Sequence, residues 1–450
     1  MRNKAISTGA AAGLFIVGLL VGLAVMYGIA ASTGLGTQTV TVGGGTVTQT
    51  VTVAGGICAS GQKITIGVLT DLSGELSDTG TKVRQAVLMA KDDVNSYLQK
   101  IGCQLTVDLA IVDYALDNQR ALSALQAMAA QGIQAVVGPL NSGAAKFILQ
   151  FADSNRIVLV SPSSTSPALA IPNDFLFRTV PNDAAQGLAG ARMMWDRGVR
   201  AAIIVNRHDA YGDGLANATA ARFKQLGGTV VDIIAYDTKT TDFTPILAKI
   251  QSDFNAAAQQ FGAERVGIYM ITFEEIGNML MTASKSFPSL LSTPQPWFGT
   301  DGQALNNKLI TNSTTGPLMV KIRLPSTLYA PVNSTKTVDF IQRFTKALGV
   351  TPDAYTMSAY DDVWLITLST LAAGKYDGQA IQRVFSSVAA NYFGLIGWTH
   401  LEPSGDLAPS IYQIWMVVSK GGTPTWVLAG TWDASTDSIT WTVPPPPPSG

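Results

Sequence analysis

Hydroxyl-bearing residues follow two apolar segments that the sequence predicts to be β-strands. Gly138-Pro-Leu-Asn-Ser142 comes directly after Ala135-Val-Val137, and Ser161-Pro-Ser-Ser-Thr-Ser-Pro167 comes directly after Ile157-Val-Leu-Val160. In an open parallel sheet, ligands bind outside the carboxyl ends of the strands, where the first N–H groups of the following helices favour an anion. The two loops therefore predict a site for a small carboxylate. Turn formation and helix capping are the alternative interpretation of either loop alone.

The sequence offers little for acid–base or metal chemistry. His208 and His400 are the two histidines and lie far apart in the chain, so a metal site or a relay triad would need other partners. No dinucleotide-binding, Walker, zinc-protease or nucleophile-elbow motif stands in a strand-to-helix context. The adjacent carboxylates Glu274-Glu275 and Asp361-Asp362 are expected to be solvated or to cap helices. We therefore expect no enzyme activity, no metal and no cofactor.

Two series of strands alternating with single helices must position the loops. The first series predicts strands at 63–69, 105–112, 135–138 and 157–160, with helices at 80–97, 118–131 and 143–154. The second predicts strands at 201–205, 229–234, 266–271 and 296–299, with helices at 184–197, 213–226, 243–257 and 274–286. Such units form right-handed crossovers and parallel sheets that are covered on both faces.

The fold class predicted from this pattern is α/β, with two doubly wound parallel-sheet lobes and an N-terminal transmembrane helix. Residues 325–331 break the pattern, and the helices at 336–348 and 356–373 come without a strand set of their own, so they must complete an earlier lobe. We expect lobe 1 at 57–181 and 325–404, and lobe 2 at 182–324 and 405–442, joined by a hinge of two or three crossings. Two such lobes close over a small ligand by hinge motion.

The N-terminal part predicts attachment to a membrane. A short basic leader at 1–8 precedes an apolar stretch at 9–31 and a Thr/Val/Gly stalk at 32–56. The length of the stretch suits a transmembrane anchor, and the basic flank places the leader in the cytoplasm and the lobes outside the cell. Removal as a signal segment at Ala30-Ala-Ser32 is the alternative. The stalk is also strand-like and could pair with a neighbouring copy. A Pro-rich tail occupies 443–450.

The charge balance excludes nucleic acid as a partner, and the cysteines and glycosylation sequons fit an extracellular location. The 30 Lys and Arg residues balance 31 Asp and Glu residues, which leaves no basic field for nucleic acid. Cys58 and Cys103 each precede a predicted strand. If these strands are parallel neighbours, the two thiols meet and form a disulfide in an oxidising exterior, and two unpaired thiols are the alternative. Glycosylation sequons stand at Asn217, Asn312 and Asn333.

Over about residues 60–442 the chain resembles the extracytoplasmic solute-binding proteins of ABC importers, in the branch typified by branched-chain amino-acid binding proteins. The segments that carry the resemblance are, in order, ITIGVLTDLSGELSDTG, VVGPLNSG, VSPSSTSPAL, FRTVPNDAAQG, NRHDAYGDGLA, YMITFEEIGNML, WFGTDG and AYDDVWLITLSTLAAG. The resemblance implies the type I periplasmic-binding-protein fold and a small ligand held between the lobes.

The resemblance also implies roles for individual residues. Ser142 matches the residue whose hydroxyl and amide hold the ligand carboxylate, and Thr165 matches a second such hydroxyl. Ser163 matches the residue that offers its backbone carbonyl to the ligand ammonium. Tyr211 matches an aromatic wall from the second lobe, and Asp301 falls where the family has an acidic partner for the ammonium. A zwitterion needs such donors at one end and acceptors at the other.

The side-chain end of the expected pocket departs from the family pattern. Asn141, Thr79 and Phe273 complete the candidate set. Thr79 stands where relatives usually carry an aromatic residue, Thr272-Phe273 replaces a pair of tyrosines, and Asp301 is one methylene shorter than the glutamate often found there. The expected ligand is therefore an amino acid or a relative of one, with peptide-like amides and aromatic acids as alternatives.

The hypothesis is a receptor on the cell membrane that captures an amino-acid-like solute outside the cell and delivers it to the permease subunits of an ABC importer. A ligand-sensing ectodomain is one alternative, and it would need a partner chain in order to signal. A surface filament subunit is another, because strand-like stalks can join copies together.

Overall fold

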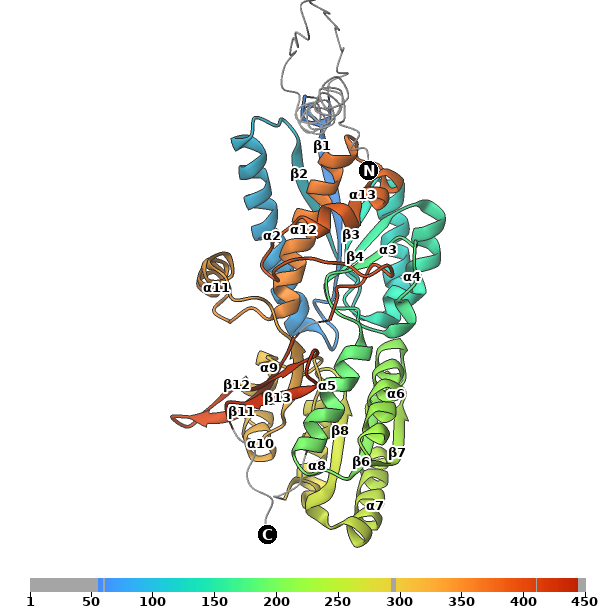
Figure 1. The fold of residues 1–450 in the computed structure, drawn as a ribbon, viewed down its shortest axis with the longest axis vertical. Coiled ribbons are helices and arrows are strands. Elements are labelled where there is room, and N and C mark those ends of the chain that lie inside the picture. The colour runs from blue at the N-terminus through green and yellow to red at the C-terminus, as the bar shows by residue number, and fades with distance from the viewer. Residues whose placement is uncertain (1–55, 60, 293–296, 410, 444–450) are drawn as a thin grey trace, which may run out of the picture.

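The computed structural model describes residues 56–59, 61–292, 297–409 and 411–443 (Figure 1). The expected leader at 1–8, the expected span at 9–31 and all but the last residue of the stalk lie outside these ranges. Within the ranges, no helix combines the length and the apolar character that a bilayer crossing requires.

Lobe 1 is built on a parallel five-stranded sheet in the order β2-β1-β3-β4-β5. Its strands are β1 (Lys63–Thr70), β2 (Thr106–Asp113), β3 (Ala135–Val137), β4 (Val158–Ser161) and β5 (Leu176–Arg178). Its helices are η1 (Ile57–Ala59), α2 (Ser77–Lys100), α3 (Asn118–Ala130), α4 (Ser142–Asn155), η2 (Pro167–Leu169), α11 (Thr335–Leu348), α12 (Ala354–Ala373) and α13 (Gly378–Ala390). Every residue of β3 and β4 is buried, because α2 and α12 cover one face of the sheet and α3 and α4 cover the other.

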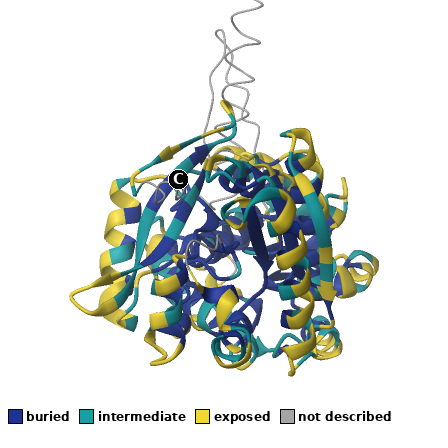
Figure 2. Cartoon of the chain, turned by 90° about the horizontal axis from the view of Figure 1, so that it is seen from below, coloured by how far each residue is buried: buried dark blue, intermediate teal, exposed yellow. Residues whose placement is uncertain are grey.

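Lobe 2 repeats this design with a parallel sheet in the order β7-β6-β8-β9. Its strands are β6 (Ala201–Arg207), β7 (Thr229–Tyr236), β8 (Val266–Ile271) and β9 (Trp297–Phe298). Its helices are α5 (Asp183–Asp196), α6 (Ala210–Gln225), α7 (Thr244–Phe261), η3 (Ala263–Arg265), α8 (Ile276–Ser286), η4 (Pro288–Leu291), α9 (Asn307–Thr311) and α10 (Thr315–Ile322). Buried residues gather in the interior, and the exposed residues lie on the outer faces of the helices (Figure 2).

The predicted helices and strands of both series are present, with ends displaced by a few residues. This confirms the α/β fold class with its parallel sheets. The sequence interpretation missed β5, α9, α10 and α13, and it also missed a third sheet.

The third sheet is antiparallel and extends lobe 2. Its strands, in the order β10-β11-β12-β13, are β10 (Ser326–Tyr329), β11 (Ile411–Lys420), β12 (Thr423–Asp433) and β13 (Ser438–Trp441). A parallel bridge between Gly299 and Ser326 joins it to the end of β9. The sequence analysis placed all of 325–404 in lobe 1, whereas β10, inside that range, pairs with β11 in lobe 2. The short strand lies between Pro325 and Pro331, which were interpreted as a break.

Within the described ranges, the chain passes between the lobes three times, from β5 to α5, from β10 to α11 and from α13 to β11 (Figure 1). These crossings form the hinge, and the number agrees with the expectation of two or three.

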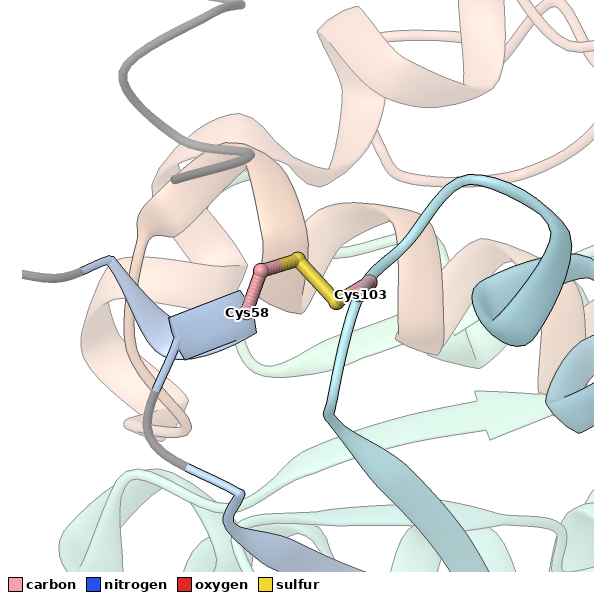
Figure 3. The surroundings of a disulfide bond; sticks show 2 residues. All are labelled: Cys58 and Cys103. Carbon is pink, nitrogen blue, oxygen red and sulfur yellow. A yellow bond between two sulfur atoms is a disulfide. The ribbon is translucent and has the colours of Figure 1, made fainter. Parts of the chain in front are cut away.

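A disulfide joins Cys58 in η1 to Cys103 just before β2 (Figure 3). The two Cα atoms lie 4.5 Å apart. The bond forms because β1 and β2 are parallel neighbours, in a register that pairs Lys63 with Thr106. The predicted disulfide is confirmed, and the alternative of two unpaired thiols is wrong.

Candidate functional site

The first hydroxyl loop turns sharply out of β3. Gly138 has a φ of 104°, and a Cβ at this position would lie 2.3 Å from the carbonyl oxygen of Leu69. Glycine is required because any other residue would meet both a clash and backbone strain. The turn leads to Asn141 and Ser142 at the start of α4. The side-chain oxygen of Asn141 accepts a hydrogen bond from the Tyr114 hydroxyl at 2.8 Å, and the Asn141 side chain does not cap α4.

The hydroxyl of Ser142 ties the second loop to the start of α4. Its Oγ accepts hydrogen bonds from the backbone N–H groups of Thr165 and Ser166, both at 3.1 Å. Because the oxygen is the acceptor in both bonds, the hydroxyl is still able to donate a hydrogen bond to a ligand. The capping interpretation is therefore wrong for the first loop. It is correct for Ser166, whose Oγ caps η2 by accepting from the N–H of Ala168.

Serine hydroxyls of the second loop satisfy the carbonyl groups of the first. Ser161 and Ser164 donate to the carbonyl oxygen of Pro139 at 2.6 and 3.1 Å, and Ser163 donates to that of Leu140 at 2.7 Å. The serines of this loop thus pair backbone acceptors that would otherwise be buried without partners.

A fully buried arginine holds the second loop from β5. Arg178 donates from Nη1 to the carbonyl oxygens of Ser164 and Ser166, at 3.0 and 2.7 Å. Its Nε donates to Oδ1 of Asp406 at 2.6 Å. Arg178 therefore connects the site loop to the segment that precedes β11.

The loops form one wall of a cavity between the lobes. All the sequence-predicted binding residues except Thr165 line it. The lining from lobe 1 is Leu76, Thr79, Leu140, Asn141, Ser142, Ser163 and Tyr355, and the lining from lobe 2 is Tyr211, Phe273, Asp301 and Gly302. The site thus draws on residues that lie more than 200 positions apart in the sequence.

Asp301 lies at the centre of a hydrogen-bond network on the lobe 2 side. Its Oδ1 accepts from Nε2 of Gln186 at 2.8 Å and from the Tyr211 hydroxyl at 2.5 Å. Its Oδ2 accepts from the hydroxyl of Tyr355, which comes from lobe 1. Burial raises the pKa of Asp301, and these donors offset part of that effect. Tyr211 also stacks on Phe273, with ring centroids 5.3 Å apart, and both rings line the cavity.

Thr165 does not line the cavity and lies beside Asp183 at the start of α5. The backbone N–H of Asp183 donates to the carbonyl oxygen of Thr165 at 2.7 Å. Both side chains are buried, and neither the Thr165 hydroxyl nor either carboxylate oxygen of Asp183 finds a hydrogen-bond partner among the described residues. Burial, together with the neighbouring Asp301 carboxylate, raises the pKa of Asp183 well above its ordinary range. A buried polar group without a partner costs about 1–3 kcal/mol, so a cationic group entering here would be stabilised.

Sequence reasoning missed Tyr355, Gln186 and Asp183. All three lie in the first turns of helices, α12 and α5, where polar residues are common and carry no distinctive spacing. Asp183 follows Asn182, which caps α5. In the sequence, Asp183 therefore looks like any acidic residue near a helix N-terminus. Within the described ranges, no group of three or more His, Cys, Asp and Glu side chains is arranged to hold a metal ion.

Comparison with known proteins gives the family. Residues 63–401 match the periplasmic binding protein family. The chain belongs to this family. An uncharacterised protein of Methanocaldococcus jannaschii is 32% identical over 397 residues, which cover 84% of this chain and 91% of that protein.

Solved structures agree with this periplasmic binding protein fold. A leucine-binding protein from Thermotoga maritima has a TM-score of 0.67 at 19% identity and covers 83% of this chain and 99% of its own. The branched-chain amino acid transporter substrate-binding protein from Streptococcus pneumoniae, in complex with isoleucine, has a TM-score of 0.65 at 20% identity and covers 82% and 99%. The resemblance is confirmed at the level of the periplasmic binding protein family and of its type I fold.

Proposed function

We propose that this periplasmic binding protein captures an amino-acid-like solute outside the cell and delivers it to an ABC permease. The observation that carries the proposal is a cavity lined by residues of both lobes, with hydroxyl groups on the lobe 1 side and the buried carboxylate of Asp301 on the lobe 2 side. Binding energy in such a site drives hinge closure rather than bond making, so the protein works as a receptor and not as an enzyme.

The proposed ligand is a small zwitterion. Its carboxylate accepts a hydrogen bond from the Ser142 hydroxyl and lies at the N-terminus of α4, where helix N–H groups favour negative charge. Its ammonium group lies beside Asp301 and toward Asp183 and the hydroxyl of Thr165, and it supplies the donor that the buried Asp183 carboxylate lacks. Thr79, Leu76 and Phe273 face the remaining part of the ligand. Charge-assisted hydrogen bonds of about 1.5–3 kcal/mol each order a zwitterion in a closed cleft.

Thermal unfolding of the full chain with added solutes tests the proposal. The amino acids, small amides and aromatic acids are each added at about 1 mM. A ligand present at 100 times its dissociation constant stabilises the native state by about 2.7 kcal/mol. A selective rise of the unfolding temperature with one class supports the receptor and gives its substrate class. Equal unfolding temperatures with every compound contradict it.

The substitutions Thr165→Ala and Asp301→Ala are each expected to weaken ligand binding by about 1–3 kcal/mol, because each removes one charge-assisted contact. The measurement is calorimetric titration with the solute found above. The lobes are expected to remain folded, and unfolding in urea checks this. Asp92→Ala, at an exposed position of α2, is the matched control and should bind as the wild type does. Unchanged affinity in both site variants would remove the two residues from the site.

Membrane attachment is the second part of the proposal. It rests on Arg2 and Lys4, which precede the uncharged apolar residues 9–31. The full chain is expected in the membrane fraction after a carbonate wash, whereas a chain without residues 1–31 is expected in the supernatant. N-terminal sequencing of the mature protein then distinguishes the retained anchor from a signal segment cleaved near Ser32, since the latter would begin beyond the apolar stretch.

A further inference from the structure

Arg207, at the end of β6, meets carboxylates from both lobes. Its Nε lies 2.7 Å from Oδ2 of Asp209, and its Nη1 lies 2.6 Å from Oε1 of Glu275. Nη1 also lies 3.2 Å from Oε2 of Glu75, which belongs to the loop between β1 and α2 in lobe 1. One guanidinium thus faces three carboxylates. We call Glu75, Arg207, Asp209 and Glu275 the Arg207 cluster.

The cluster forms only where the lobes touch. Beside it, the backbone N–H of Glu274 donates to the carbonyl oxygen of Glu75 at 3.1 Å, and the N–H of Asp78 donates to Oε1 of Glu274 at 2.8 Å. Both bonds join lobe 1 to lobe 2. Opening of the hinge would therefore return Glu75 to water, while Arg207, Asp209 and Glu275 would stay together in lobe 2.

The cluster also contacts the wall of the binding cavity. The guanidinium carbon of Arg207 lies 3.9 Å from the centroid of the Phe273 ring, and Phe273 stacks on Tyr211. Closure that brings Glu75 onto Arg207 is thus linked through one aromatic ring to the residues that line the ligand site.

Glu75 is the weakest-held carboxylate of the cluster. Glu275 also accepts hydrogen bonds from the Tyr236 hydroxyl at 2.7 Å and from the N–H of Phe273 at 2.8 Å. Glu75 has the longest contact to Arg207 and keeps 36% of its side chain exposed. Three carboxylates around one guanidinium leave a net negative charge. This charge disfavours ionisation of Glu75, the carboxylate with the weakest contacts to donors. Burial, and then repulsion from Glu275, raises the pKa of Glu75 from its ordinary 4.5 to about 7.

We propose that closure of the two lobes takes up a proton at Glu75, so that this protein closes on its ligand more strongly at acid than at alkaline pH. The ligand part rests on the function proposed above.

The direction of the pH effect follows from the difference in the pKa of Glu75 between the open and the closed state. In the open state Glu75 faces water and loses its proton near its ordinary value, whereas in the closed state it keeps the proton up to a pH of about 7. The proton therefore favours closure at pH values below about 7, and this contribution is lost as the pH rises through 7. The groups on the elements packed against Glu75 are Asp71, Asp78, Arg207, Asp209, Tyr236, Glu274, Glu275 and Lys308.

Fluorescence energy transfer in the ligand-free full chain tests the proposal. Dyes are placed on cysteines introduced at the exposed positions Asp92 in lobe 1 and Lys321 in lobe 2, and the closed fraction is measured between pH 5.5 and 8.5. The ratio of closed to open protein is expected to rise about thirtyfold between pH 8.5 and pH 5.5. In Glu75→Gln and Glu75→Ala, which carry no charge at this position, most of this pH dependence should be lost.

Two comparisons make the result specific. Glu402→Gln, an exposed glutamate outside the cluster, should keep the wild-type pH dependence. Asp183 and Asp301 also have raised pKa values, and any contribution from them would persist in Glu75→Gln. Equal pH dependence in the wild type and in Glu75→Gln, or none in either, overturns the proposal. Because no ligand is used, this outcome is independent of the solute screen, whose failure contradicts the receptor function alone.

Discussion

The paired substitutions Cys58→Ser and Cys103→Ser are expected to lower the free energy of unfolding by about 4 kcal/mol. The disulfide joins residues 45 positions apart and therefore restricts a long loop in the unfolded chain. It also fixes the amino-terminal ends of β1 and β2. The opposite end of β1 leads to Leu76 and Thr79 in the cavity. Urea unfolding of the variant and of the wild type measures the difference.

Reduction provides the matched control for this prediction. The wild type in reducing buffer should unfold at the same urea concentration as the double variant, and the variant itself should not respond to reductant. Denatured, unreduced wild type should show no free thiol. A loss below about 1 kcal/mol would mean that strand pairing alone holds the loop ends, since the entropic effect of a closed loop this long is several times larger.

The sequence predicted the parallel lobes because their strands are buried on both faces and appear as unbroken apolar runs. The third sheet left a weaker signal. In β11, buried residues alternate with partly exposed ones and the last two residues are exposed, and β10 has only four residues. The one clear mark was Gly421-Gly422, both with positive φ, which forms the turn between β11 and β12. That pair was not interpreted as a hairpin.

The candidate site, like the fold, was predicted only in part. The two hydroxyl loops were recognisable because strand ends in a parallel sheet face the ligand crevice. Tyr355 was not recognisable from the sequence. No residue near it shows that α12 brings the Tyr355 hydroxyl to Asp301 across the hinge. Such a contact depends on the path of the chain between lobes and not on local spacing.

The adjacent carboxylates were predicted only in part. Glu274 caps the start of α2 by accepting a hydrogen bond from the N–H of Asp78. Capping is one of the two roles that the sequence predicted for these carboxylates. Glu275, Asp361 and Asp362 are buried, so the expectation that they are solvated is wrong for them. Asp361 accepts hydrogen bonds from the N–H groups of Leu395 and Ile396. Its charge therefore holds a turn that follows α13.

Arg178→Met is expected to lower the free energy of unfolding by about 3–5 kcal/mol, because it leaves a buried carboxylate without its cation. Arg178 is fully buried and Asp406 is 2% exposed. Their segments are also joined through the backbone, since the N–H of Arg178 donates to Gly405 and the N–H of Leu407 donates to Arg178. The substitution thus loosens two hinge crossings, β5 to α5 and α13 to β11. Chemical unfolding measures the loss.

The same substitution should also weaken ligand binding, because the carbonyl groups of Ser164 and Ser166 lose the donor that positions the second hydroxyl loop. Arg383→Met, at an exposed arginine of α13, is the control and should change stability by less than about 0.5 kcal/mol. Adding Asp406→Leu to Arg178→Met removes the unpaired charge and should restore part of the stability, but not the affinity, because the loop still lacks its donor. If affinity returned together with stability, Arg178 would act on the ligand site only through the overall stability of the fold.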